Sequence, residues 1–392
     1  MSQDRPAPPD RSALAVVYVT VFIDLLGFGI ILPSLPYYAR ALGASGFRLG
    51  VLFTSYSLAQ LVGSTVLGRL SDRHGRRPIL LLSLLGSSVS MAFSGLATGL
   101  LPLAAARALA GLFGGSIATA QAYIADVTGR DERAKYMGLL GASIGIGFVL
   151  GPALGAGIVA LGGGFAGSAF VASFLAALNL GFAWTRLPES RPRAGGAGSH
   201  RLTFHAFLAL LTRPSLWRIL AATFLTTFAF VALEATLAYF AKDRFGITER
   251  RFGAILAYVG LIVIGVQGGL IGRMTRAFGV RHVAIAGEIL MGAALLCLPF
   301  SSSAAWMLAA LGLASAGQAM CSPTLSTLLS QGGTPDDHGT LLGAGQSLAA
   351  AARATSPLLA GLLYDLQPES PYMVSGALAA LAGGLVLSSR ET

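Results

Sequence analysis

The chain has 392 residues, of which 54% are hydrophobic and only 11% are charged, and its mean hydropathy is +0.70. Soluble globular domains carry about 25% charged residues, so this composition excludes a water-soluble protein. The formal net charge of +10 would suit either a nucleic acid or a membrane surface as partner, and the positions of the basic residues decide between the two.

Long apolar stretches recur from one end of the chain to the other. A helix needs about 20 apolar residues to cross a hydrocarbon core about 30 Å thick. The sequence therefore predicts an all-α integral membrane protein with twelve transmembrane helices. These helices are expected near 13–38, 47–67, 78–97, 101–125, 137–160, 165–185, 216–240, 251–271, 281–300, 304–329, 339–363 and 371–389.

The basic residues gather in the loops of one side. If the N-terminus is inside, the even-numbered connections and the two tails hold 19 of the 27 Lys and Arg residues. Cytoplasmic loops carry such an excess, so we expect a multi-pass protein of the cell inner (plasma) membrane with both termini cytoplasmic. The basic excess then needs no nucleic acid partner.

A polar linker separates the first six predicted helices from the last six. We expect a cytoplasmic tail (1–12), an N-terminal six-helix bundle (13–186), the cytoplasmic linker (187–214), a C-terminal six-helix bundle (215–389) and a short tail (390–392). The halves share patterns: GRLSDRHGRRP, which begins at Gly68, is echoed by GRMTRAFGVRH, which begins at Gly272. Many transporters consist of such repeats, with the substrate site between them.

The loop from Gly68 to Pro78 combines an aspartate, four arginines and spaced glycines. A loop that only had to be basic would need neither the aspartate nor the glycines. The order G-x-L-x-D-R-x-G-R-R resembles the signature loop between helices 2 and 3 of the major facilitator superfamily of secondary transporters. The resemblance implies two pseudo-symmetric six-helix bundles and a cytoplasmic gate, for which a static loop anchor is the alternative. The gate residues are Gly68, Asp72, Arg73, Gly75, Arg76, Arg77 and Asp126, and Asp126 is expected to meet Arg73, Arg76 or Arg77.

Charged residues inside predicted membrane helices are candidates for proton coupling, because each costs about 2.5 to 3.5 kcal/mol at a helix centre. Asp24 lies eleven residues into the first helix, near the middle of the membrane. Its carboxyl group could take up a proton on one side and release it on the other. The alternative is a fixed ion pair with Arg107 that only holds two helices together. The full set is Asp24, Arg107, Glu234, Glu288 and Arg353.

Uncharged polar side chains in the helices are candidates for a substrate cavity. Each is equally suited to a hydrogen bond between helices. The cavity candidates are Gln60, Gln121, Tyr123, Gln267, Gln318 and Gln346.

The fifth predicted helix is rich in glycine around one proline. Glycines spaced four apart allow a neighbouring backbone to approach closely, and a proline kinks a helix. The core formed by Gly147, Gly151, Pro152 and Gly155 resembles the antiporter signature of exporters in this superfamily. That signature usually ends in two glycines, and here Ala156 takes the last position.

The first helix narrows the resemblance further. Its pattern D-x-x-G-x-G-x-x-x-P-x-x-P, from Asp24 to Pro36, is similar to that of the tetracycline:proton antiporters and related twelve-helix drug exporters. Those exporters carry further carboxylates where Ser90 and Gly292 stand here, so a metal-chelated tetracycline is less favoured as substrate.

The resemblance implies a proton-coupled antiporter that exports small amphipathic drugs or metabolites by alternating access. The alternative is a lipid or lysolipid translocase, or an exporter of an endogenous metabolite, on the same scaffold. We expect a monomer with no metal and no cofactor, driven by the proton gradient, whose partners are a small-molecule substrate, protons and membrane lipids. The chain is not expected to be an enzyme, since it has no HExxH, GxSxG or Walker-type motif.

Overall fold

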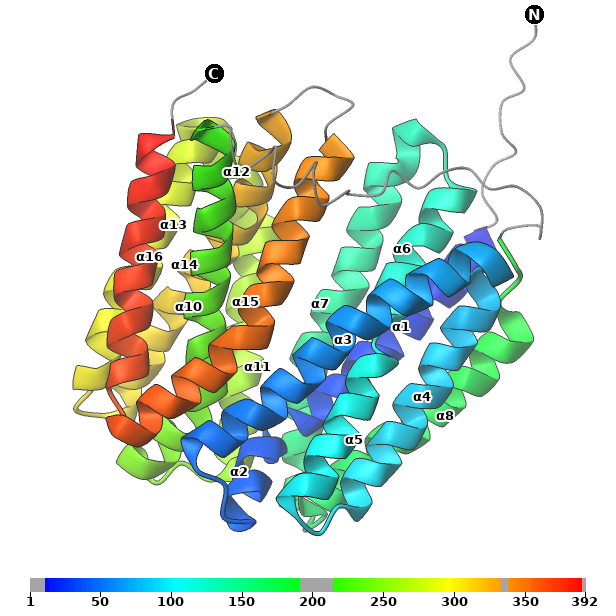
Figure 1. Ribbon diagram of the computed structural model, residues 1–392, viewed down its shortest axis with the longest axis horizontal. Helices are drawn as coiled ribbons and strands as arrows, with labels where there is room; N and C mark the ends of the chain where they lie inside the picture. The colour runs from blue at the N-terminus through cyan, green and yellow to red at the C-terminus, as the bar shows by residue number, and fades with distance from the viewer. Residues whose placement is uncertain (1–10, 191–213, 333–337, 390–392) are drawn as a thin grey trace, which may run out of the picture. The chain divides into compact units, whose positions relative to one another are not determined.

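The computed structural model describes residues 11–190, 214–332 and 338–389, and every regular element in these ranges is a helix (Figure 1). The predicted tails, apart from a few residues, and most of the predicted linker lie outside these ranges. The first half contains α1 (Arg11–Ile31), α2 (Ser34–Ala41), α3 (Gly46–His74), α4 (Arg76–Leu96), α5 (Leu100–Leu112), α6 (Ser116–Val127), α7 (Arg130–Ala160) and α8 (Gly164–Arg186).

The second half repeats this pattern of long helices. It contains α10 (Pro214–Phe245), α11 (Glu249–Gly265), the π-helical turn η1 (Val266–Leu270), α12 (Ile271–Phe278), α13 (Val280–Cys297), the 3-10 turn η2 (Leu298–Phe300), α14 (Ala304–Gln331), α15 (His338–Leu366) and α16 (Ser370–Ser388). Within the described residues, eleven helical segments are long and apolar enough to cross a membrane. Helix α15 has 29 residues and is the twelfth long segment. The prediction of an all-α membrane protein is confirmed.

Two predicted membrane helices are each broken into two pieces. The segment predicted at 13–38 ends its first helix at Ile31, just before Pro33, which has no amide hydrogen to continue the helical ladder. The segment predicted at 101–125 is interrupted at Phe113, Gly114 and Gly115, between α5 and α6. Both breaks lie at residues that disfavour a regular helix.

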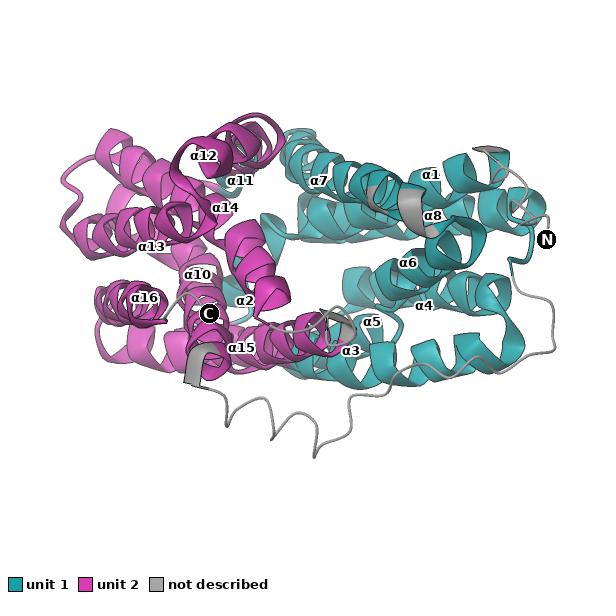
Figure 2. Cartoon of the chain, turned by 90° about the horizontal axis from the view of Figure 1, so that it is seen from above, with its two compact units in different colours: residues 1–42, 55–196, 249–257 teal, residues 43–54, 197–248, 258–392 magenta. Residues whose placement is uncertain are grey.

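The chain divides into two compact units (Figure 2). Unit 1 comprises residues 1–42, 55–196 and 249–257, and unit 2 comprises residues 43–54, 197–248 and 258–392. In unit 1, an apolar core joins α1, α6 and α7 through residues such as Val21, Ile124 and Leu140. In unit 2, the corresponding core joins α10, α13 and α14 through residues such as Leu220 and Ala284.

The two halves carry the same local geometry at two positions that match in the sequence. Gly75 precedes α4 with a φ of 98°, and Gly279, 204 positions later, precedes α13 with a φ of 81°. Such φ values favour glycine, because a side chain would be strained there. Two residues after each glycine, Arg77 and Arg281 donate to backbone carbonyls near the end of the last helix of their half, at Trp184 and Val386 respectively.

Candidate functional site

Asp24 is held by two serine hydroxyl groups in unit 1. Ser87 of α4 donates to Asp24 Oδ1 at 3.3 Å, and Ser116 of α6 donates to Asp24 Oδ2 at 2.5 Å. The side chain is half-buried on α1. Neither serine was among the residues singled out in the sequence, because serines are common in membrane helices and nothing in their spacing marks these two.

The break between α5 and α6 places Ser116 at the first position of α6. The side-chain Nε2 of Gln60 donates to the carbonyl of Gly114 at 3.4 Å. Helix α3 thereby contacts the break between α5 and α6. The first amides of a helix have no partner within the helix and carry a partial positive charge. The break therefore brings a helix start, and a hydroxyl donor on it, to the carboxylate of Asp24.

The ion-pair alternative requires Arg107 to contact Asp24, but its hydrogen bonds go to other side chains. Its side chain is 3% exposed on α5, and its Nη2 donates to Ser94 Oγ at 2.6 Å. Met91 Sδ lies 3.5 Å from the same nitrogen. In unit 1, Asp24 therefore bonds to Ser87 and Ser116, whereas Arg107 contacts Ser94 and Met91.

Glu234 and Arg353 form the charged pair of unit 2. Glu234 is exposed on α10 and Arg353 is exposed on α15. The charge of Arg353 is close enough to act electrostatically on the carboxylate of Glu234.

Glu288 is enclosed within unit 2. Its side chain is fully buried on α13, and it accepts a hydrogen bond from the hydroxyl of Thr226 on α10. Gly383 of α16 lies so close that a side-chain carbon on it would come within 3.2 Å of Glu288 Cβ. Helices α10 and α16 therefore cover this carboxyl group on α13.

The polar cavity candidates occupy different surroundings. Gln60 donates to the hydroxyl of Tyr56 at 3.1 Å, whereas Gln121, Gln267 and Gln346 are exposed. Gln318 is half-buried, with its Oε1 atom unpartnered. Gln267 lies in η1, and π-helical turns often occur at functional sites.

Tyr123 is the exception among these candidates. It is 1% exposed within the core of unit 1, and its hydroxyl donates to the carbonyl of Pro188 at 3.1 Å. This position favours a packing role over a cavity-lining role, because the ring is covered by apolar neighbours.

Arg76, the first residue of α4, is the centre of a hydrogen-bond network where α3 ends and α4 begins. Its Nε donates to Asp126 Oδ2 at 2.8 Å, and its Nη1 donates to Asp72 Oδ1 at 2.8 Å. The residue is only 7% exposed. The expectation that Asp126 meets an arginine of the predicted loop is confirmed, and Arg76 is that arginine. In the second half, Arg276 takes the position that corresponds to Asp72 and donates to Gly272 of its own helix.

Glu189 completes this network from the linker, and no sequence pattern marks it as a partner of α4. Its carboxylate accepts hydrogen bonds from the backbone amides of Arg76, at 2.8 Å, and Arg77, at 3.2 Å. It thereby caps the start of α4, where an anion is favoured by the helix dipole. Because Glu189 lies in a loop, no helical periodicity marks it.

The glycines of the antiporter signature pack α7 against α1. A side-chain carbon on Gly151 would lie 2.7 Å from the Cα of Gly29, and one on Gly147 would lie 2.9 Å from the Cβ of Leu25. Gly155 has a similarly close neighbour in the carbonyl of Ile30. The fifth predicted helix is α7, and its predicted close approach to a neighbouring backbone is confirmed. That neighbour is α1, which carries Asp24.

Ala156, the departure from the signature, faces a glycine. A side-chain carbon on Gly253 of α11 would lie 2.6 Å from Ala156 Cβ and 2.9 Å from the carbonyl oxygen of Pro152, all within unit 1. Unit 2 repeats this contact, because Gly50 of α3 packs in the same way on the carbonyl of Pro357. The methyl group of Ala156 is accommodated because residue 253 has no side chain.

Helices of this number and order, with a charged junction between α3 and α4 and carboxyl groups within the membrane segments, are features of a membrane transporter. The family model of the Major Facilitator Superfamily matches residues 17–276 and 268–391. The chain belongs to this superfamily and is a membrane transporter.

The relatives agree with this assignment. The chain is 32% identical over 366 residues to the class C tetracycline resistance protein of Escherichia coli, covering 90% of each chain. It is 27% identical over 393 residues to multidrug resistance protein 2 of Bacillus subtilis, covering 97% of this chain and 96% of that protein. The crystal structure of the human organic anion transporter MFSD10 (TETRAN) superposes with a TM-score of 0.72 at 27% identity, covering 97% of this chain and all of that chain. The predicted resemblance to tetracycline-resistance-type transporters is confirmed.

Proposed function

We propose that this transporter is a proton-coupled antiporter that exports small amphipathic drugs or metabolites by alternating access. It is proposed to act as a monomer in the cell inner membrane, with both termini cytoplasmic and the proton gradient as its energy source. The observation that carries this proposal is the setting of Asp24, a carboxyl group within membrane-spanning α1 whose hydrogen bonds come from Ser87 and Ser116.

Two hydroxyl groups suit a carboxyl group that changes its protonation state. A serine hydroxyl donates to a carboxylate, and after rotation it accepts from a protonated carboxylic acid. A fixed arginine partner can only donate, so it would favour the charged carboxylate alone. The surroundings of Asp24 therefore support both the loaded and the unloaded form of a proton carrier.

Export also needs a source of energy and a contact that transmits a change at the proton site to another helix. A proton that enters down one pH unit supplies about 1.4 kcal/mol, and the membrane potential adds about 2.3 kcal/mol per 100 mV. The close backbone contact between α1 and α7 at Gly29 and Gly151 supports coupling. Because no side chains intervene there, a change at Asp24 can be transmitted to the glycine-rich helix.

Glu234 and Glu288 are proposed as further members of the proton-coupling set. Glu234 is the more accessible of the two, and Arg353 supplies its counter-charge. Glu288 is enclosed by α10, α13 and α16, so its participation would require a larger rearrangement. We therefore expect the contribution to coupling to decrease in the order Asp24, Glu234, Glu288.

An organic anion is a second candidate substrate. The human relative described above is an organic anion transporter. In this chain, Arg353 is exposed on the 29-residue helix α15 and could attract an anionic group. The choice between an amphipathic cation and an anion is open to direct measurement.

The test uses purified protein in proteoliposomes that contain a pH-sensitive dye. Tetracycline, ethidium and fluorescein serve in turn as the imposed substrate gradient. In the wild type, at least one of them should drive proton movement in the opposite direction. Asp24→Asn should abolish this proton flux, whereas the control Glu132→Gln, at an exposed carboxylate on α7, should retain it. Full coupling in Asp24→Asn would refute the proposal, and a response to fluorescein alone would favour the organic anion.

A further inference from the structure

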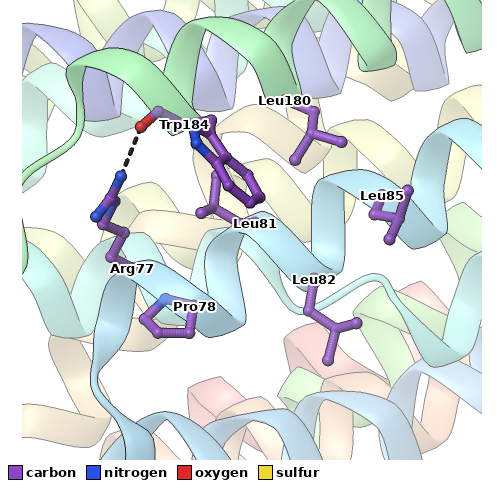
Figure 3. Close-up of a pocket in the computed structure, with 7 residues that line it drawn as sticks. All are labelled: Arg77, Pro78, Leu81, Leu82, Leu85, Leu180 and Trp184. Atoms are coloured by element: carbon purple, nitrogen blue, oxygen red, sulfur yellow. Dashed lines mark hydrogen bonds between the residues drawn. The ribbon is translucent and has the colours of Figure 1, made fainter.

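A groove lies between α4 and α8 on the surface of unit 1. It is lined by α4 from Arg77 to Leu85 and by Leu180 and Trp184 of α8, and its volume is about 540 Å³ (Figure 3). The volume falls within the range of small-molecule sites, about 300 to 1,000 Å³. Its lining residues are not part of the Asp24 site or of the charged pair of unit 2, and only Arg77, through its backbone amide, also contacts the Arg76 network.

The groove runs along the membrane-spanning parts of both helices. Helices α4 and α8 are among the segments long and apolar enough to cross a membrane. Leu82, Leu85 and Trp184 are exposed to 37%, 48% and 63% respectively. Exposed apolar side chains on a membrane-spanning helix are covered by lipid chains, because water is absent from the hydrocarbon core.

One end of the groove is cationic and the remainder is apolar. Arg77 is the second residue of α4, and its Nη2 donates to the carbonyl of Trp184 at 2.6 Å, as Figure 3 shows. The Nε atom of Arg77 is buried without a hydrogen-bond partner. Arg77 is the only charged residue among those that line the groove.

The aromatic residue marks the depth of the groove in the membrane. Trp side chains are enriched at membrane–water interfaces, where the ring meets the headgroups. From Arg77 to Leu85 the helix rises about 12 Å at 1.5 Å per residue. A headgroup at Arg77 would therefore leave the first part of an acyl chain beside Leu82 and Leu85.

We propose that this groove binds one anionic phospholipid of the leaflet that faces the start of α4. Its phosphate lies at Arg77, and an acyl chain lies along Leu82, Leu85 and Trp184. Basic pockets between membrane helices bind anionic headgroups in this way. The site is independent of the transported substrate, and its occupant also links α4 to α8 next to the Arg76 network.

The test is native mass spectrometry of the full chain, in detergent that contains equal amounts of phosphatidylglycerol and phosphatidylcholine of the same chain length. The wild type should retain phosphatidylglycerol in preference to phosphatidylcholine. Arg77→Gln should reduce phosphatidylglycerol retention about fivefold, as expected for the loss of one basic residue at a membrane surface. The control Arg48→Gln, at an exposed arginine near the start of α3, should leave it unchanged.

A second variant distinguishes lipid binding in the groove from the hydrogen bond that Arg77 makes to Trp184 of α8. Leu82→Trp fills the groove without changing the charge, and Leu178→Trp places the same ring on α8 outside the groove lining. Leu82→Trp should reduce phosphatidylglycerol retention, and Leu178→Trp should not. Equal retention of both lipids by the wild type, or undiminished phosphatidylglycerol in Leu82→Trp, would overturn the proposal.

Discussion

The Nε atom of Arg76 donates a 2.8 Å hydrogen bond to Asp126 Oδ2, which ties the start of α4 to the end of α6. The side chain of Arg76 is 9% exposed and that of Asp126 is 26% exposed, so the pair is only partly screened by solvent. A single arginine thus connects the loop after α3 to the helix that also carries Ser116, a partner of Asp24.

A double-mutant cycle should show that Arg76 and Asp126 stabilise each other. We expect Arg76→Ala, Asp126→Ala and the double variant to give a coupling energy of about 1 to 2 kcal/mol, as is usual for contacting charged groups. Thermal unfolding in detergent measures it. The pair of Arg69→Ala with Asp126→Ala is the control, since Arg69 is exposed on α3, and it should be additive. Additivity in both cycles would show that the contact contributes no stability.

Glu189→Ala should destabilise the start of α4. The variant removes the carboxylate that accepts from the amides of Arg76 and Arg77, and the loss of a helix cap costs about 1 kcal/mol. The unfolding temperature should therefore decrease by a few degrees. Glu132→Ala, which changes an exposed glutamate on α7, should have a smaller effect. The capping role would be wrong if both variants unfolded at the same temperature as the wild type.

Gly151→Ala should disrupt the packing of α7 on α1. The new methyl group would lie 2.7 Å from the Cα of Gly29 and 2.8 Å from the carbonyl oxygen of Leu26, and backbone atoms cannot easily move aside. Overpacking of this kind costs about 1 to 3 kcal/mol. Thermal unfolding and transport should both be impaired.

The matched control is Gly157→Ala on the same helix, because a side-chain carbon there meets no atom within 4 Å. It should leave the unfolding temperature unchanged or slightly increased, since alanine is favoured over glycine inside a helix by about 0.5 to 1 kcal/mol. Equal effects of the two variants would mean that the contact with Gly29 does not matter.

Asp365→Ala should loosen the first turn of α3. The carboxylate of Asp365, at the end of α15, accepts from the amides of Gly46 at 2.6 Å and Phe47 at 2.8 Å, within unit 2. Without it, both amides should exchange with deuterium faster in hydrogen–deuterium exchange mass spectrometry. The exposed neighbour Gln367→Ala is the control and should leave the exchange of these amides unchanged. Unaltered exchange in Asp365→Ala would exclude Asp365 as the cap.

Several features of this transporter follow from the sequence alone. Hydropathy identifies the membrane segments, because the hydrocarbon core imposes their length. The loop at Gly68 and the glycines around Pro152 identify the superfamily and the antiporter resemblance.

Only the tertiary structure decides which side chains meet. The partners of Asp24 come from α4 and α6, 63 and 92 positions away, and the break after α5 is what brings Ser116 to it. Glu189 reaches the start of α4 from a loop 113 positions from Arg76. Such contacts depend on the packing of helices that are distant in the sequence, and the local pattern of apolar and polar residues does not determine that packing.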